Sequence, residues 1–305
     1  MQRILGDVEM IEWGDVRIFL EVAKCRSTLA ASKKLGMNQA TVSRRVSAFE
    51  QATGLVLFER DTRGSSLTLA GRSLVGTAEQ MRNCAQEIEM RVGGLKRRDG
   101  GKIRISAATD SVEYWVIPVT TAYSAKNPDV KFEIWDTNRS VDLEHGEADV
   151  AFRATDTVSG DDLIVRKLGM IPWAVYCSRA LARESGMPRS LDEMAGKPVV
   201  NYMPDVVSKI EILREFAKRL SADQVEETFR TLSAASAAIG HMHAFCILPV
   251  VVGESRSNLV YCFREEFMLM PLWLVTSKEA YQSPIIRDFL KFAGSFGLKD
   301  GLTLV

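Results

Sequence analysis

One stretch of the sequence, residues 37–54 (MNQATVSRRVSAFEQATG), carries side chains whose chemistry suits contact with a nucleic acid. On a helical wheel its apolar residues share one face, and the opposite face holds Ala40, Arg44, Ser47 and Gln51, flanked by Gln39 and Ser43. Arginine can pair with guanine or phosphate, glutamine with adenine, and serine with phosphate or base edges. We therefore predict a helix that enters a DNA groove, although a solvated amphipathic helix has a similar composition.

Two helices would precede this stretch and position it. The first is indicated by a buried apolar stripe, Val16, Phe19, Leu20 and Ala23. The segment STLAASKKLGM predicts a short second helix, which Gly36 would end. Asn38 is then well placed to cap the third helix, with Val42, Val46 and Phe49 as its buried face and Gly54 at its end.

A hairpin is predicted directly after the third helix. The segment LFERDTRGSSLTL contains two short extended pieces around a basic tip rich in Gly and Ser, with Arg60 and Arg63 near that tip. Three helices and a hairpin in about sixty residues have the outline of a winged helix-turn-helix, whose last helix enters the major groove. Double-stranded DNA is therefore the expected partner of this part.

A long helix from Ala70 to Leu95 is expected next. Its apolar residues are spaced alternately by four and three, at Leu74, Ala78, Met81, Ala85, Ile88, Val92 and Leu95. A sustained 3.5-residue period favours a coiled-coil contact between two copies of the chain. The alternative is a helix packed on its own domain.

Charge is distributed unevenly along the chain. The 305 residues include 39 basic and 39 acidic side chains, so the net charge is zero. Residues 1–98 hold 16 basic and 11 acidic side chains, a net of +5, which leaves −5 on residues 99–305. A positive first part suits contact with a polyanion, and the rest does not.

Neither export nor membrane insertion is predicted. The start, MQRILGDVEM, lacks a cationic head followed by an apolar run, and no apolar segment approaches the ~20 residues that cross a bilayer. The five cysteines have no CxxC spacing, which argues against a disulfide framework and a zinc ribbon. We expect reduced thiols in a cytoplasmic protein with no membrane partner.

The second part of the chain alternates strands with helices. The segments KIRISAA, VKFEIWD and DVAFR are typical of strands, and SVEYWVIPVTTAYSAKNP of a helix. Such alternation predicts an α/β fold with parallel sheets and a ligand at the carboxyl ends of the strands. The change of pattern at LKRRDGGK predicts these domains: residues 1–69, a linker and dimerisation helix 70–98, and an α/β domain 99–305.

Polar side chains at the first strand end could bind an anion. Thr109 and Ser111, in ATDSVEYW, follow a strand and begin a helix, where hydroxyls and backbone N–H groups suit a carboxylate or phosphate. The alternative is that Asp110 or Ser111 is a plain N-cap. Arg153, at the end of DVAFR, could neutralise an anionic ligand or lie solvated at a strand end.

The sequence contains little that indicates catalysis or metal binding. The sequence has no GxSxG, P-loop, GxGxxG or HExxH motif, so we expect no enzyme and no cofactor. His241, His243 and Cys246 make an incomplete metal constellation, and no metal site is predicted. Cys246 and Cys262 could form a redox switch, although lone buried thiols are commoner.

The sequence resembles the LysR-type transcriptional regulators. The skeleton AA…LGM.Q..VSRRV..FE...G..LFER......LT.AG, over about fifty residues, is similar to their DNA-binding domain. Two departures are Ala40, where the family usually has Pro, and CRSTL, where a Gly-Ser pair is common. The resemblance and the helix pattern together give the expected DNA contacts: Ser27, Thr28, Asn38, Gln39, Ala40, Thr41, Ser43, Arg44, Arg45, Ser47, Arg60 and Arg63. Arg45 lies nearer the apolar flank, which favours phosphate or an intradomain contact for it.

Over the rest of the chain the resemblance is weaker. GKIRISAATDS, DLEHGEADVAFR and VNYMPD are similar to segments of the family's effector domain, which has two Rossmann-like lobes like those of periplasmic solute-binding proteins. The resemblance implies lobe I at about 99–167 and 271–305 and lobe II at about 168–270. It implies an effector site between the lobes, formed by Thr109, Asp110, Ser111, Thr137, Asn138, Arg153, Tyr202, Pro204, Ser233 and Ala234.

The expected function is that of a bacterial, sequence-specific transcriptional regulator. By resemblance it works as a homodimer or homotetramer on DNA, with a small anionic metabolite as effector and RNA polymerase as a further candidate partner. GHMHAFCILP departs from the family's Gly-rich turn at Met242 and Ala244, which affects the shape of the hinge-side pocket. The alternative is a DNA-bound regulator that responds to oxidation or to a protein partner.

Overall fold

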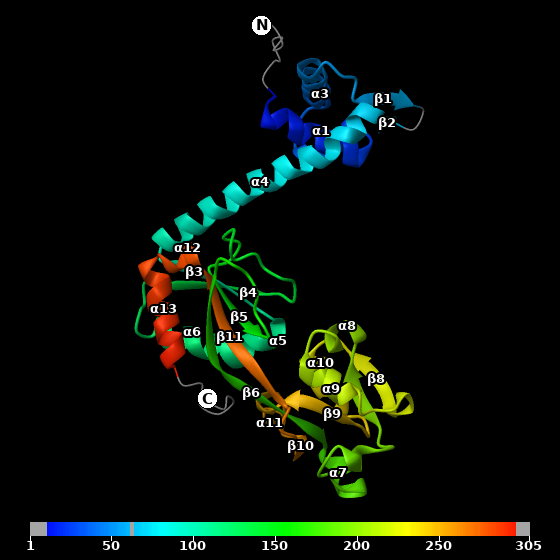
Figure 1. The fold of residues 1–305 in the computed structure, drawn as a ribbon, viewed down its shortest axis with the longest axis vertical. Coiled ribbons are helices and arrows are strands. Elements are labelled where there is room, and N and C mark those ends of the chain that lie inside the picture. Colours follow the sequence, from blue (N-terminus) through cyan, green and yellow to red (C-terminus); the bar gives the residue numbers. More distant parts are fainter. Residues whose placement is uncertain (1–10, 62–63, 297–305) are drawn as a thin grey trace. The chain divides into compact units, whose positions relative to one another are not determined.

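The chain divides into two units, Met1–Glu89 and Met90–Val305, joined by one long helix. The computed structural model describes residues 11–61 and 64–296 (Figure 1). The elements of the first unit are three helices, a hairpin and the first part of the long helix: α1 Trp13–Cys25, α2 Thr28–Leu35, α3 Gln39–Thr53, β1 Phe58–Asp61, β2 Gly64–Leu67 and α4 Leu69–Asp99. This order confirms the predicted winged helix-turn-helix.

The helix limits in the first unit follow from local chemistry. The Asn38 carboxamide oxygen accepts a hydrogen bond from the Ala40 amide at 2.8 Å and so caps α3, as predicted. Gly36 and Gly54 end α2 and α3 in the left-handed region, at φ values of 64° and 65°. Only glycine adopts that conformation without strain from a Cβ atom, so both helices stop where the sequence indicates.

The apolar face of α3 holds it against the other helices. Phe49 packs in one core cluster with Phe19, and Val42 and Val46 pack in a second cluster with Val22. The Phe19 and Phe49 rings lie 5.4 Å apart between centroids. These contacts leave the opposite face of α3 turned away from the core.

Helix α4 packs on its own domain along its first part, and a coiled-coil contact along the rest stays a prediction. Ala78 is buried in the core of the first unit and Leu74 packs against it. Farther along the helix the seam is exposed, with 64% of Ile88 and 52% of Leu95 accessible. The helix also runs through Asp99, beyond the predicted end at Leu95, because Arg97 and Arg98 pair with the buried carboxylate of Asp149.

The second unit is built on a mixed sheet with strand order β4-β3-β5-β11-β6-β9-β7-β8, and β10 pairs with β6. The strands are β3 Lys102–Ala107, β4 Lys131–Asp136, β5 Val150–Ala154, β6 Leu163–Ser178, β7 Val199–Tyr202, β8 Val225–Phe229, β9 Phe245–Pro249, β10 Leu259–Phe263 and β11 Leu269–Ser277. The longer helices are α6 Ile117–Ser124, α7 Arg179–Ser185, α9 Glu211–Ala217, α10 Leu232–Ile239 and α13 Pro284–Ser295. Short helical segments are α5 Thr109–Ser111, η1 Val112–Val116, η2 Asp192–Met194, α8 Pro204–Val207, η3 Ala222–Gln224, α11 Val250–Glu254 and α12 Lys278–Tyr281.

Two strands correct the expectation of purely parallel sheets. β3 pairs in parallel with β4 and β5, and β7 with β8 and β9, as predicted. β6 and β11, however, pair antiparallel with each other. The reason is that these strands carry the chain from one lobe to the other and back, so they must run in opposite directions. β6 pairs with β11 up to Pro172 and with β9 from Trp173 onward.

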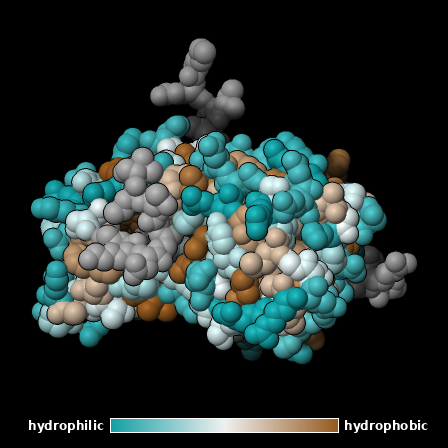
Figure 2. All heavy atoms as spheres, turned by 90° about the horizontal axis from the view of Figure 1, so that it is seen from below, coloured by the Kyte–Doolittle hydropathy of each residue, from teal (hydrophilic) through white to brown (hydrophobic). Residues whose placement is uncertain are grey.

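We name the lobes by this pairing. Lobe I contains β3, β4, β5 and β11, and lobe II contains β7, β8, β9 and β10 (Figure 1). The α/β class and the two-lobed arrangement agree with the prediction, whereas the domain and lobe limits given above stay a prediction. Within the described ranges, no helix is both long and apolar enough to cross a membrane. The face in Figure 2 is mostly hydrophilic, with its apolar atoms in small separate groups.

Candidate nucleic-acid interface and ligand cleft

The polar face of α3 is exposed in the first unit. Gln39, Ala40, Arg44 and Ser47 are all exposed, and Thr41 and Ser43 are half-buried beside them. The Arg44 side chain makes no ion pair with any described residue, so its five donors are available to an anion or a base edge. The structure thus gathers the predicted reading residues on one surface.

Arg45 has a different environment from its neighbour. Its guanidinium lies 3.1 Å from the carboxylate of Asp15 and 3.2 Å from that of Glu12. Asp15 is nearly buried, and burial raises the pKa of its carboxyl, which the Arg45 charge partly offsets. Arg45 therefore ties α3 to α1.

The start of α2 lies next to the start of α3. The Ser27 hydroxyl caps α2 by accepting from the Ala30 amide at 3.3 Å. The side-chain amide of Gln39 donates a hydrogen bond to the Thr28 hydroxyl at 3.3 Å, and this bond joins the starts of α2 and α3. Ser27 and Thr28 thus lie where backbone N–H groups could meet a phosphate.

The hairpin is anchored by a residue that sequence reasoning missed. One carboxylate oxygen of Glu50 accepts hydrogen bonds from the Leu57 and Phe58 amides, at 2.7 and 3.1 Å. Glu50 therefore fixes where β1 leaves α3. Its position on the half-buried side of α3 was the one sequence feature that could have indicated this role. The Arg60 side chain and all of Arg63 lie outside the described residues, so their contacts with DNA stay a prediction.

The second unit contains a cavity of about 600 Å³ between the two lobes. Its wall combines aromatic and aliphatic side chains from both lobes with a smaller number of polar groups. Trp115 and Trp173, both almost fully buried, contribute rings from opposite sides of the lobe boundary. A cavity of this size suits a small organic molecule.

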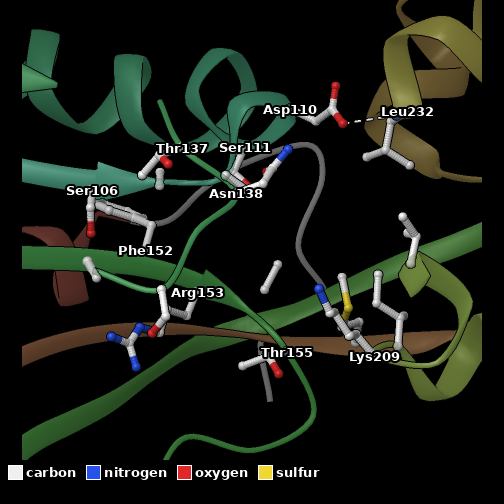
Figure 3. Close-up of a pocket in the computed structure, with 18 of the residues that line it drawn as sticks. Ser106, Asp110, Ser111, Thr137, Asn138, Phe152, Arg153, Thr155, Lys209 and Leu232 are labelled. Atoms are coloured by element: carbon white, nitrogen blue, oxygen red, sulfur yellow. Dashed lines mark hydrogen bonds between the residues drawn. The ribbon is translucent and has the colours of Figure 1, made fainter. Parts of the chain in front are cut away.

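Six of the ten predicted effector residues line this cavity: Asp110, Ser111, Thr137, Asn138, Arg153 and Tyr202. All of these except Tyr202 are labelled in Figure 3. The other four are not among its lining residues: Thr109, Pro204, Ser233 and Ala234. Thr109 and Pro204 are exposed at the starts of short helices. Ser233 and Ala234 begin α10, whose first amides are already bonded by Asp110 and by the Thr231 hydroxyl. A role in effector binding stays a prediction for all ten positions.

Two cations in the cavity wall, Arg153 and Lys209, form no salt bridge with any described residue. Two other arginines of the wall are neutralised: Arg139 pairs with Glu147, and Arg230 pairs with Asp205 at 2.5 Å. Arg153, from lobe I, donates only to the Val141 carbonyl at 3.3 Å, and Lys209, from lobe II, makes no ion pair. Burial removes part of the water around the Arg153 guanidinium and so lowers its pKa.

Two serine hydroxyls add polar groups to this wall. Ser106 and Ser111 are 5% and 3% exposed, and neither hydroxyl bonds to another described residue. In Figure 3 Ser106, Thr137 and Arg153 lie on the same side of the cavity. Ser106 was not among the predicted site residues, although it alternates with Ile103 and Ile105 along β3 and so projects from the opposite face of the strand. A half-buried arginine together with free hydroxyls can bind an oxyanion.

The cysteines are arranged differently from the pair considered above. Cys246 is fully buried, which raises the pKa of its thiol to about 12. The thiol of Cys262 lies 3.6 Å from that of Cys177 on the neighbouring strand, and its hydrogen bond lowers the Cys177 pKa. In the described part of the chain, no cluster of His, Cys, Asp and Glu could hold a metal ion.

Comparison with known proteins decides what kind of chain this is. A family profile described as "Bacterial regulatory helix-turn-helix protein, lysR family" matches residues 13–72. A second, described as "LysR substrate binding domain", matches residues 96–296. The chain belongs to the LysR family. It has the family's DNA-binding and effector-binding domains, and the family consists of transcriptional regulators, not enzymes.

Relatives of this LysR-family chain include an HTH-type transcriptional regulator of Xanthomonas campestris pv. campestris, 31% identical over 180 residues. That match covers 59% of this chain and 52% of the relative. YhjC of Escherichia coli is 26% identical over 193 residues, which cover 62% of this chain and 63% of YhjC. The matched segments thus span about half to two thirds of these relatives.

Solved structures of LysR-family proteins share the fold. Full-length CbnR, crystallised with its target DNA, has a TM-score of 0.62 at 17% identity, and the match covers 93% of this chain and 99% of CbnR. AphB, a virulence activator of Vibrio cholerae, has a TM-score of 0.56 at 20% identity, covering 94% and 99%. At these identities the likeness establishes the fold alone.

Proposed function

We propose that this LysR-family regulator binds DNA in a sequence-specific way and senses a small anionic metabolite in the cleft between its lobes. Support for DNA reading comes from the exposed polar face of α3, where Arg44 is unpaired while Arg45 is held by α1. CbnR, which has the same fold, was crystallised with its target DNA. We place the protein in the cytoplasm, where its DNA target would lie.

The charge of the ligand is inferred from one observation. Arg153 lines the cavity half-buried, and among the described residues its hydrogen-bond partner is the neutral Val141 carbonyl and no carboxylate forms a salt bridge with it. A buried cation without a partner is costly, and a bound anion would remove that cost. The apolar rest of the wall favours a ligand with an apolar body next to its anionic group.

We further propose that the chain works as a homodimer, with homotetramers as a further level of assembly. The exposed seam residues of α4, here called the α4 stripe, are Met81, Ile88, Val92 and Leu95, which are 38% to 64% accessible. Apolar residues at heptad spacing on one helix are the usual surface of a helix pair. Contact with RNA polymerase stays a prediction.

Thermal unfolding against small carboxylates and phosphates tests the ligand proposal. We expect at least one anionic compound to raise the melting temperature, because a ligand at 100 times its Kd adds about 2.7 kcal/mol of stability. Arg153→Gln should abolish that rise, whereas Arg189→Gln, at an exposed position outside the cavity wall, should preserve it. Stabilisation by neutral or cationic compounds alone would overturn the anionic assignment.

The same experiment with peroxide tests the alternative of a redox sensor. The 3.6 Å approach of the Cys177 and Cys262 thiols is the observation that favours it. A peroxide would take two electrons from the two thiols, which would join as a disulfide while the peroxide is reduced to an alcohol and water. A shift with peroxide that Cys262→Ser removes, without any shift from metabolites, would favour this alternative.

A further inference from the structure

Asp110 reaches from lobe I to the start of a helix in lobe II. Its two carboxylate oxygens accept hydrogen bonds from the Leu232 amide at 2.9 Å and the Ser233 amide at 3.3 Å. Figure 3 shows the bond to Leu232. These amides are the first of α10, and the Thr231 hydroxyl bonds the next one, at Ala234. The cap on α10 is therefore shared between a residue of its own lobe and a residue of the other lobe.

Asp156 makes a second contact of the same kind. It follows β5 in lobe I, between two residues that line the cavity, Thr155 and Thr157. Its carboxylate accepts from the Glu211 amide at 2.9 Å, at the start of α9 in lobe II, and lies 3.8 Å from the Arg214 guanidinium. Two carboxylates of lobe I thus meet the amino ends of two helices of lobe II.

Both contacts have favourable electrostatics. The first amides of a helix carry partial positive charge and lack partners within the helix, so a carboxylate satisfies and stabilises them. The side chain of Asp156 is 25% exposed, so its interaction is only partly screened by water. Since each contact joins residues on opposite sides of the cleft, separation of the lobes would break both.

We propose that Asp110 and Asp156 form a latch that holds the two lobes together and sets how readily the cleft opens. The latch regulates the proposed ligand cleft and so rests on the proposed function. It also restricts where a ligand can place its charge. Because Asp110 occupies the first amides of α10, the anionic group of a ligand is directed to Arg153 in lobe I. Asp110 is thus a determinant of ligand specificity as well as of closure.

Amide hydrogen exchange of the full chain, without added ligand, tests the latch. Asp110→Ala should expose the Leu232 and Ser233 amides directly. If the two aspartates act as one latch, it should also speed exchange at Glu211, which Asp110 does not touch, by roughly fivefold, the factor expected for loss of one helix cap. Asp156→Ala should reciprocally speed exchange at Leu232 and Ser233. Fragmentation mass spectrometry resolves these positions.

Asp205→Ala is the matched control, because it removes a cavity-wall carboxylate whose partner, Arg230, belongs to the same lobe. It should leave exchange at all three amides unchanged. If either alanine variant fails to fold, the Leu variants, which keep the bulk of the side chain but have no acceptor oxygen, give the same comparison. Faster exchange confined to each aspartate's own partners would mean two independent caps and would overturn the latch. Since no ligand is used, this outcome would leave the anion proposal for Arg153 standing.

Discussion

Replacement of Arg44 by alanine is expected to weaken binding to the protein's own upstream DNA by roughly tenfold to a hundredfold, the range for loss of one good side-chain contact to a base. Arg44 lies on the exposed face of α3 and is not used within its own domain. Its removal should therefore leave the melting temperature of the protein unchanged. Fluorescence anisotropy with a labelled upstream fragment measures the affinity.

Arg45→Ala is the matched control for Arg44→Ala, since the two residues are adjacent in one helix. Its guanidinium pairs with Asp15 and Glu12, so its loss leaves a nearly buried carboxylate without its cation. We expect a lower melting temperature, the reverse of the Arg44→Ala pattern. Unchanged DNA affinity in folded Arg44→Ala protein would count heavily against α3 as the reading helix.

Replacement of Ile88 by glutamate is expected to convert the proposed dimer to a monomer. Ile88 is the most exposed residue of the α4 stripe, with 64% of its surface accessible. In a symmetric helix pair the substitution would bury two like charges and raise the dissociation constant by on the order of a hundredfold or more. DNA affinity should fall as well, because each monomer would bind its half-site alone. Analytical ultracentrifugation measures the assembly state.

Asn83→Glu is the control for this substitution. Asn83 is exposed on the same helix but lies outside the heptad seam. The substitution therefore adds the same negative charge away from the α4 stripe. We expect the dimer to persist. A dimer that survives Ile88→Glu with an unchanged dissociation constant would show that the copies meet elsewhere.

The first unit could be predicted closely from the sequence because its determinants are local. Asn38, Gly36 and Gly54 act within one turn of the residues that they cap or end. The spacing of the apolar residues in α3 identifies its buried face, even when the helices that it packs against are not known. The role of Glu50 could not be predicted, because its carboxylate bonds two backbone amides seven and eight residues farther along the chain. The sequence pattern does not indicate such a contact.

The ligand cleft was harder to predict because it depends on contacts between distant segments. The sequence predicts Asp110 as a cap of its own helix or as a ligand contact, yet its carboxylate caps a helix that begins 122 residues later. Likewise the antiparallel course of β6 and β11 follows from the chain's path between lobes, which strand and helix alternation does not reveal.

Footprinting of the full chain on its own upstream DNA, over a range of salt concentrations, tests the central claim most directly. Non-specific binding falls steeply with salt, so sequence-specific protection should persist when general protection is lost. We predict two protected half-sites related by a dyad, as expected for a dimer that places two α3 helices in successive major grooves. Uniform protection that disappears everywhere at the same salt concentration would contradict sequence-specific reading by this protein.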